Sequence, residues 1–66
     1  MAGGWGDALD AAAYLDLSLS VVRRETRAGR LKAYRVGGRK LVRYRRTDCD
    51  AYLEAQAVAV PVKVKR

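Results

Sequence analysis

Three arginines lie close together near the middle of the chain, at spacings that gather them on one side of a helix. Arg23 and Arg24 are adjacent, Arg27 follows four and three residues later, and Ser20 falls on the same side. Guanidinium groups this close repel one another. They are most useful opposite phosphates and guanine edges, where an arginine fork makes two bonds at once. The pattern predicts contact with a polyanion, and a solvated helix face is the alternative.

The segment that carries these arginines has the signals of a helix at both ends. Ser18 can accept a hydrogen bond from a free N–H of the first turn, and Gly29 suits the left-handed conformation that often follows a helix. Val22 and Thr26 are four residues apart and form the face that should point into the core. Residues 18–29 are therefore predicted to form a helix with its two caps.

The net charge of the chain is concentrated around this helix. The 66 residues carry a net charge of +7. Residues 1–20 hold three acids and no base, residues 21–46 hold eleven bases and one acid, and residues 47–66 hold three of each. A concentrated basic block is typical of a protein that binds a polyanion such as nucleic acid. A membrane surface is the less favoured target, because the block lacks a long amphipathic helix.

Composition excludes several other classes of protein. A chain of this length forms one small domain with a modest core. A single cysteine and the absence of histidine exclude an internal disulfide and a zinc finger, and remove most nucleophile–base pairs. We expect no enzymatic activity, no metal, no cofactor and no small-molecule substrate. No apolar run is long enough to cross a membrane and no signal peptide is evident, so a cytoplasmic location is expected.

A second helix is predicted before the arginine-rich one. Asp7 is a suitable N-cap and Asp10 lies at the third helical position, so the helix should cover about residues 8–15. Its thin apolar stripe consists of Ala11, Ala12 and Leu15. Residues 16–18 form a short turn, in which Asp16 can adopt the left-handed conformation. Helix, short turn and helix make the helix-turn-helix pattern, whose second helix enters the major groove of DNA.

The pattern changes after Gly29 to the alternation of β-strands. Residues 31–36 and 40–45 alternate between apolar and basic side chains. Between them, Gly37-Gly38 supplies the positive φ angles of a tight hairpin. Tyr34 and Val36 are expected to face the same way as Val42 and Tyr44.

Such a two-stranded ribbon beside a recognition helix is a wing, and an ordinary surface hairpin is the alternative. Arg39 and Lys40 would lie at the wing tip. Candidate phosphate contacts on the strands are Arg35, Arg43 and Arg45.

A third helix and two terminal segments complete the predicted organisation. Thr47 is expected to cap a helix over residues 48–57, whose apolar spacing includes Cys49 as a small buried residue. Residues 1–6 are glycine-rich and expected to be flexible, with Trp5 either packed on the domain or free for a partner. Residues 58–66 are expected to form a basic tail. Three roles fit its sequence: a disordered segment, a strand that docks a partner, or an additional phosphate contact. The domain proper is residues 7–57.

These residues resemble a known family. Residues 7–53 are similar to the excisionase-type DNA-binding domain, a small α+β winged helix with MerR-like helix-turn-helix geometry, three helices and a two-stranded wing. The matching segments are AAAYLDLS at 11–18, VVRRETRAGRL at 21–31, YRVGGR at 34–39 and RRTDCDAYL at 45–53. SLSVVRRETR at 18–27 also resembles the recognition helix of lambda-type phage excisionases. Asp16 and Cys49 replace the family's usual glycine and leucine. Glu25 and Thr26 replace large apolar residues, which predicts a thin core.

The resemblance implies both a binding mode and a function. Arg23, Arg24 and Arg27, with Ser20, would contact the major groove, and Arg39 would enter the minor groove. The implied protein is an excisionase, or recombination directionality factor. It would bend DNA beside an attachment site in a bacterial host, bind next to further copies of itself and assist an integrase.

Two other functions are compatible with parts of this sequence. A small winged-helix transcription regulator is the main alternative, although a MerR-type regulator would be expected to continue into a dimerisation segment after residue 57. An RNA- or ribosome-associated protein is disfavoured, because no aromatic cluster suited to stacking single-stranded bases is evident.

Overall fold

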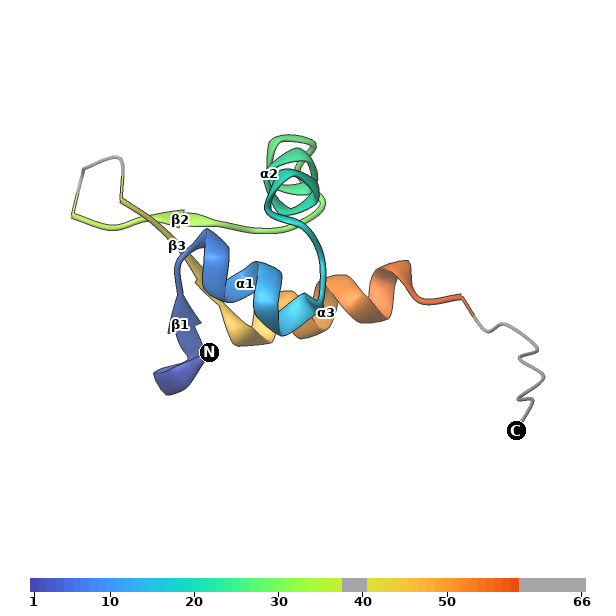
Figure 1. The fold of residues 1–66 in the computed structure, drawn as a ribbon, viewed down its shortest axis with the longest axis horizontal. Coiled ribbons are helices and arrows are strands. Elements are labelled where there is room, and N and C mark those ends of the chain that lie inside the picture. The colour runs from blue at the N-terminus through green and yellow to red at the C-terminus, as the bar shows by residue number, and fades with distance from the viewer. Residues whose placement is uncertain (38–40, 59–66) are drawn as a thin grey trace.

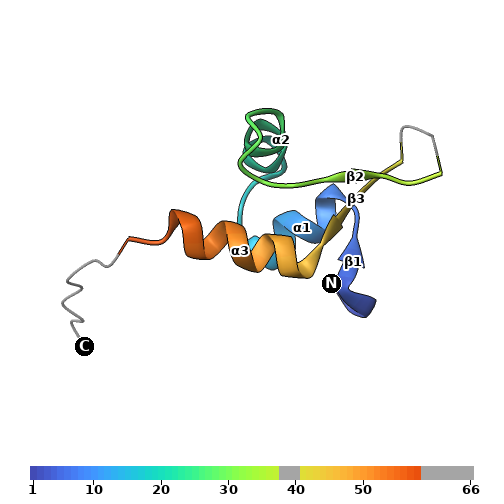
Figure 2. The ribbon, with the colours of Figure 1, turned by 180° about the vertical axis from the view of Figure 1, so that it is seen from behind.

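In the computed structural model, which describes residues 1–37 and 41–58, three helices pack against a short antiparallel sheet (Figure 1). The elements run in the order η1 (Ala2–Gly4), β1 (Trp5–Gly6), α1 (Ala8–Leu15), α2 (Leu19–Arg27), β2 (Tyr34–Arg35), β3 (Val42–Arg45) and α3 (Arg46–Gln56). The β2–β3 hairpin extends to one side of the helices, and α3 extends to the other (Figures 1 and 2). The predicted α+β class, with three helices and a hairpin wing, is confirmed.

The helix-turn-helix forms where the capping residues predict it. Asp7 and Asp10 make a reciprocal capping box at the start of α1, with backbone-to-carboxylate distances of 2.9 and 3.0 Å. Asp16 ends α1 in the left-handed conformation, with a φ of 57°. The hydroxyl of Ser18 then accepts a bond from the Val21 N–H and starts α2. Gly29 follows α2 with a φ of 82°, as predicted.

The sheet differs from the prediction in length and in its number of strands. The expected strands 31–36 and 40–45 shorten to Tyr34–Arg35 and Val42–Arg45. Residues 1–6 were expected to be flexible, but Trp5 and Gly6 instead form β1 and pair with Arg45 and Tyr44 of β3. The strand order is therefore β1-β3-β2, with β3 in the centre.

The register of the hairpin corrects the expected faces of its side chains. Tyr34 pairs with Arg43, and Arg35 pairs with Val42. Directly paired residues of an antiparallel sheet point to the same face. Tyr34 therefore lies opposite to the face of Val42 and Tyr44, and the expected match between them is wrong. The alternation on both strands favours a register that gathers the apolar residues on one face, and the tertiary packing overrides that preference.

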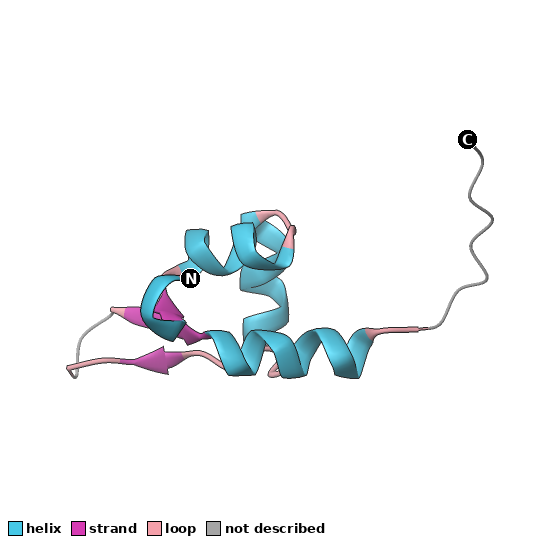
Figure 3. Ribbon diagram, turned by 90° about the horizontal axis from the view of Figure 1, so that it is seen from below, coloured by secondary structure: helices cyan, strands magenta, loops and turns pink. Residues whose placement is uncertain are grey.

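The third helix begins earlier than expected. β3 continues directly into α3, as Figure 3 shows. The N-cap is Arg45, which is still extended and makes no side-chain capping bond, so Thr47 is the second helical residue and not the cap. Asp48 lies in the first turn, where a carboxylate is favourable, and it also binds the Arg45 guanidinium at 3.2 Å. This ion pair stabilises the strand-to-helix junction without a capping hydroxyl.

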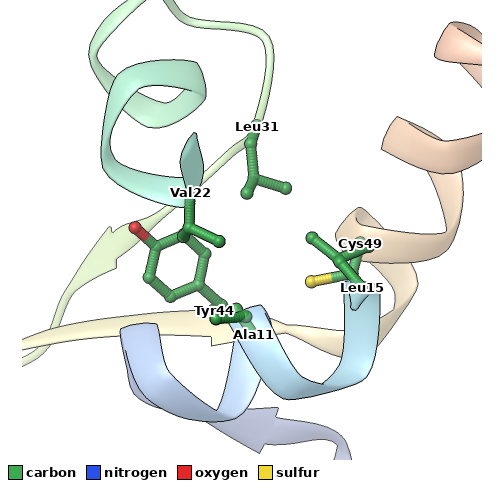
Figure 4. Packing of buried hydrophobic residues seen from close by; sticks show 7 residues of the cluster. Ala11, Leu15, Val22, Leu31, Tyr44 and Cys49 are labelled. Carbon is green, nitrogen blue, oxygen red and sulfur yellow. The ribbon is translucent and has the colours of Figure 1, made fainter. Parts of the chain in front are cut away.

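A small core joins the three α-helices, β3 and the loop after α2 (Figure 4). Its buried members are Ala11, Ala12, Leu15, Val22, Leu31, Tyr44 and Cys49. The small alanines of α1 let α2 and β3 approach closely. Cys49 is fully buried, as the sequence predicts. The Tyr14 hydroxyl on α1 donates to Asp50 on α3 at 2.6 Å, which adds a polar link at the edge of this core.

Candidate nucleic-acid interface

The outer surface of α2 carries the four residues predicted to contact the major groove. Val22 is fully buried, and this fixes which side of α2 faces the core. With about 100° between successive residues, Ser20, Arg24 and Arg27 point nearly opposite to Val22, and Arg23 lies to one side. All four are exposed. The structure therefore brings Ser20, Arg23, Arg24 and Arg27 together on one solvent-facing surface.

Two of these arginines border the wing. A groove between α2, β3 and the start of α1 is lined by Ala8, Arg23, Thr26, Arg27, Val42 and Tyr44. Arg23 and Arg27 are one turn apart on its α2 side. Arg35 is exposed on β2 and shares a sheet face with Val42, so it lies on the same side of the wing as this groove. Exposed arginines of α2 and of β2 therefore lie on the same side of the hairpin.

A pair of hydroxyl groups connects the recognition helix to the wing. Thr26 and Tyr44 lie 2.7 Å apart through their side-chain oxygens, and the Thr26 hydroxyl is also 2.7 Å from the carbonyl of Val22. Tyr44 is buried in the core at the centre of the sheet. A direct hydrogen bond therefore joins α2 to β3, in addition to their apolar packing in the core.

The other two predicted phosphate contacts lie on the opposite face of the sheet. Arg43 pairs with Tyr34 and donates from Nη1 to the carbonyl of Val42 at 3.1 Å. Arg45 donates to Asp48 and, at 3.0 Å, to the Tyr34 hydroxyl. Its guanidinium also lies 5.2 Å from the Tyr34 ring and 5.8 Å from the Trp5 ring. Arg45 is thus engaged within the fold, and the structure does not bring Arg43 or Arg45 together with the α2 arginines.

The wing tip follows Gly37 in the sequence. Gly37 has a positive φ of 70°, as expected at the start of the hairpin turn. The predicted tip residues Arg39 and Lys40 lie outside the described residues, as does the tail from residue 59 onward. Their roles stay predictions.

A buried carboxylate at the base of α2 was not predicted from the sequence. Glu25 is only 5% exposed. It accepts two bonds from Arg30, at 2.8 and 2.9 Å, one from the Tyr52 hydroxyl at 3.0 Å and one from Arg24 at 3.4 Å. The bonds from Arg30 lower the pKa of Glu25 to about 2, and they outweigh the opposing effect of burial.

Glu25 was expected only to thin the core, because it replaces a large apolar residue. It instead joins three parts of the fold: α2, the loop that follows it and α3. Arg30 is five residues beyond Glu25 and Tyr52 is twenty-seven beyond, so no helical spacing in the sequence signals the cluster. Thr26, the second substitution of this kind, is likewise used for a hydrogen bond.

The described residues contain no group of three or more side chains suited to hold a metal ion, and none of their helices has the length and apolarity needed to span a membrane. What they do present is a short recognition helix with an exposed arginine face, fixed beside a basic wing. Together these features define a winged helix-turn-helix protein that binds double-stranded DNA.

Comparison with known families agrees with this assignment. A family model described as a helix-turn-helix domain matches residues 10–57, which include α2, both wing strands and α3. The chain belongs to this family of DNA-binding domains, which includes excisionase-like members. No curated protein and no solved structure gives a significant match to the sequence.

Proposed function

We propose that this protein is an excisionase, a recombination directionality factor that binds DNA beside an attachment site in a bacterial host and assists an integrase in excision. The observation that carries the proposal is the set of exposed arginines on α2 together with Arg35, which lies on the same side of the hairpin as the groove lined by Arg23 and Arg27. A duplex that receives α2 in its major groove can meet the wing in the adjacent minor groove. Membership of a family with excisionase-like members supports the same function.

The mechanism is architectural. Bending a short duplex costs roughly 1–6 kcal/mol, which extra protein contacts along the bent path must offset. The hydrogen bond between Thr26 and Tyr44 links α2 to the wing strand β3. Two linked contacts would favour one path of the duplex over others, which is the property an architectural protein needs.

The wing tip is expected to contribute affinity more than sequence preference. Arg39 would enter the minor groove, which distinguishes bases poorly and is read mainly through its width and potential, and Lys40 would contact DNA beside it. Replacing both by alanine should weaken binding to all duplexes while preserving the preferred sequence. Unchanged affinity would show that the tip does not touch DNA.

Neighbouring copies are proposed to bind cooperatively. One helix and one wing offer little surface for high specificity, so several adjacent sites would be needed. Exposed Asp7, Asp10 and Asp16 lie at the ends of α1, and the basic middle of the chain also has exposed bases outside α2, such as Lys32 and Arg46, that would face them on a neighbouring copy. Contact between these surfaces is heterologous, and it would build an open array of copies and not a closed dimer. Footprints in which each site fills with its isolated affinity would exclude cooperation.

The decisive experiment is recombination in vitro with the cognate integrase and attachment-site DNA. The protein should promote excision and suppress integration. Because bending is part of the proposal, the gel mobility of its DNA complexes should also depend on whether the binding site lies near the middle or near the end of the duplex. If it changes neither reaction, the excisionase proposal fails.

A small transcription regulator is the second candidate, because the same DNA-binding fold also serves promoters. Run-off transcription with and without the protein separates the two functions. An effect on transcription with none on recombination would favour the regulator.

A further inference from the structure

The side chain of Arg24 contacts that of Glu25, the next residue in the sequence. Adjacent residues on a helix point about 100° apart and do not normally face each other. The Nε of Arg24 nevertheless lies 3.4 Å from Oε2 of Glu25. The Arg24 side chain is 66% exposed, so this contact restrains a guanidinium that remains open to solvent.

The acceptor in this contact is itself fixed. The Glu25 carboxylate is held by Arg30 from the loop after α2 and by Tyr52 from α3, at distances of 2.8–3.0 Å. These bonds do not involve Arg24. Glu25 therefore stays in place while Arg24, which contacts it through Nε, offers its Nη groups to another partner.

Arg23 and Arg27 differ from Arg24 in this respect. Within the described part of the chain, the ion pairs on or next to α2 are those of Glu25 with Arg24 and Arg30. Neither Arg23 nor Arg27 takes part in one. Of the three exposed arginines of α2, Arg24 is therefore the one whose side-chain direction is restrained by an ion pair within the described residues.

We infer that Glu25 is a positioning residue for Arg24, and that Arg24 is the arginine of α2 that discriminates between bases. The inference rests on the proposed sequence-specific binding of DNA. A base edge demands a defined direction of the guanidinium fork, whereas a phosphate tolerates many. A side chain that is already ordered loses less freedom on binding, and this ordering is worth roughly 2- to 10-fold in affinity. The freer Arg23 and Arg27 suit phosphates.

The test compares base preference and not affinity alone. Selection from random duplexes with the wild-type protein gives the preferred site, and binding is then measured for every single-base-pair change in that site. Glu25→Gln should lose discrimination, roughly 2- to 10-fold, at the same base pair as Arg24→Ala. In the double variant, the loss at that pair should be no larger than in Arg24→Ala alone. Binding to random duplexes should not weaken in Glu25→Gln, because the protein gains positive charge.

A purely structural role for Glu25 gives a different result. Discrimination would then fall at every position, and the losses of the two single variants would multiply in the double variant. Tyr52→Phe is the matched control, because it removes one bond to Glu25 and leaves the contact with Arg24. It should retain the wild-type preference at the Arg24 base pair.

A measurement on the wild-type protein covers the case in which Glu25→Gln does not fold. Nitrogen-15 relaxation of the arginine side chains should show a more ordered Nε–H for Arg24 than for Arg23 and Arg27. Equal mobility of the three would overturn the inference. A wild-type protein that enriches no sequence refutes the proposed function and this inference together, whereas enrichment with an unchanged Glu25→Gln profile refutes only the role of Glu25.

Discussion

Replacing Arg27 by alanine should remove close to one phosphate contact from the DNA complex. Arg27 is exposed on the α2 side of the groove beside the wing, one turn from Arg23. Neither arginine forms a salt bridge within residues 1–37 and 41–58. Their charge is therefore available to neutralise DNA phosphates and to release counterions.

The size of the effect follows from counterion release. Each phosphate contact contributes about 0.9 to the slope of log affinity against log salt. A fourfold rise in salt should therefore reduce the ratio of wild-type to Arg27→Ala affinity for DNA by roughly 3.5-fold. For the double variant, in which Arg23 is also replaced by alanine, the same affinity ratio should fall by roughly 12-fold.

The assay is fluorescence anisotropy with one labelled duplex, titrated at several salt concentrations. Circular dichroism must first show that each variant is folded. Arg27→Lys is the matched control, because it keeps the charge and should keep the wild-type slope. If Arg27→Ala has the wild-type slope, or if Arg27→Lys loses as much slope as the alanine variant, Arg27 does not hold a phosphate.

Three further predictions concern stability. Because the pKa of Glu25 is lowered from 4.5 to about 2, its stabilising contribution is complete above pH 4.5 and is lost as the pH falls toward 2. Urea denaturation across this range should show the loss in wild type, and Glu25→Gln should lack that component. Leu31 is 1% exposed, so Leu31→Ala should lower the free energy of unfolding by about 2–5 kcal/mol. Tyr44→Phe removes only the hydrogen bond to Thr26 and should lower it by about 0.5–1.5 kcal/mol. If urea denaturation gives the reverse order, the described packing is contradicted. The fluorescence of Trp5 should change in the same cooperative transition as circular dichroism, and an earlier separate transition would show that β1 is not part of the domain.

The helix-turn-helix could be predicted because its signals are local. Each helix begins where a side chain, that of Asp7 or Ser18, accepts a bond from an N–H group of the first turn. Gly29 follows the end of α2 in the left-handed conformation. These signals act within a few residues, so α1 and α2 begin and end where the sequence predicts. The same locality explains why Asp16 could be predicted to adopt the left-handed conformation.

The errors concern contacts between distant segments. The hairpin register depends on how Val42 and Tyr44 pack on the helices, and β1 depends on a pairing between Trp5 and Arg45. The Glu25 cluster likewise depends on Tyr52, from the last helix. Residue types alone predicted the basic face of α2, but not which of its arginines is restrained.

The pairing of β1 with β3 also bears on aggregation and proteolysis. β3 is the central strand only because β1 covers one of its sides. Cleavage after Gly6 would turn β3 into an edge strand with unpaired N–H and C=O groups, a template on which another chain can add a strand. A protein trimmed in this way keeps α2 but can associate with itself through the exposed edge of β3. If the first residues are lost during purification, we therefore expect precipitation even though the residues proposed to contact DNA are still present.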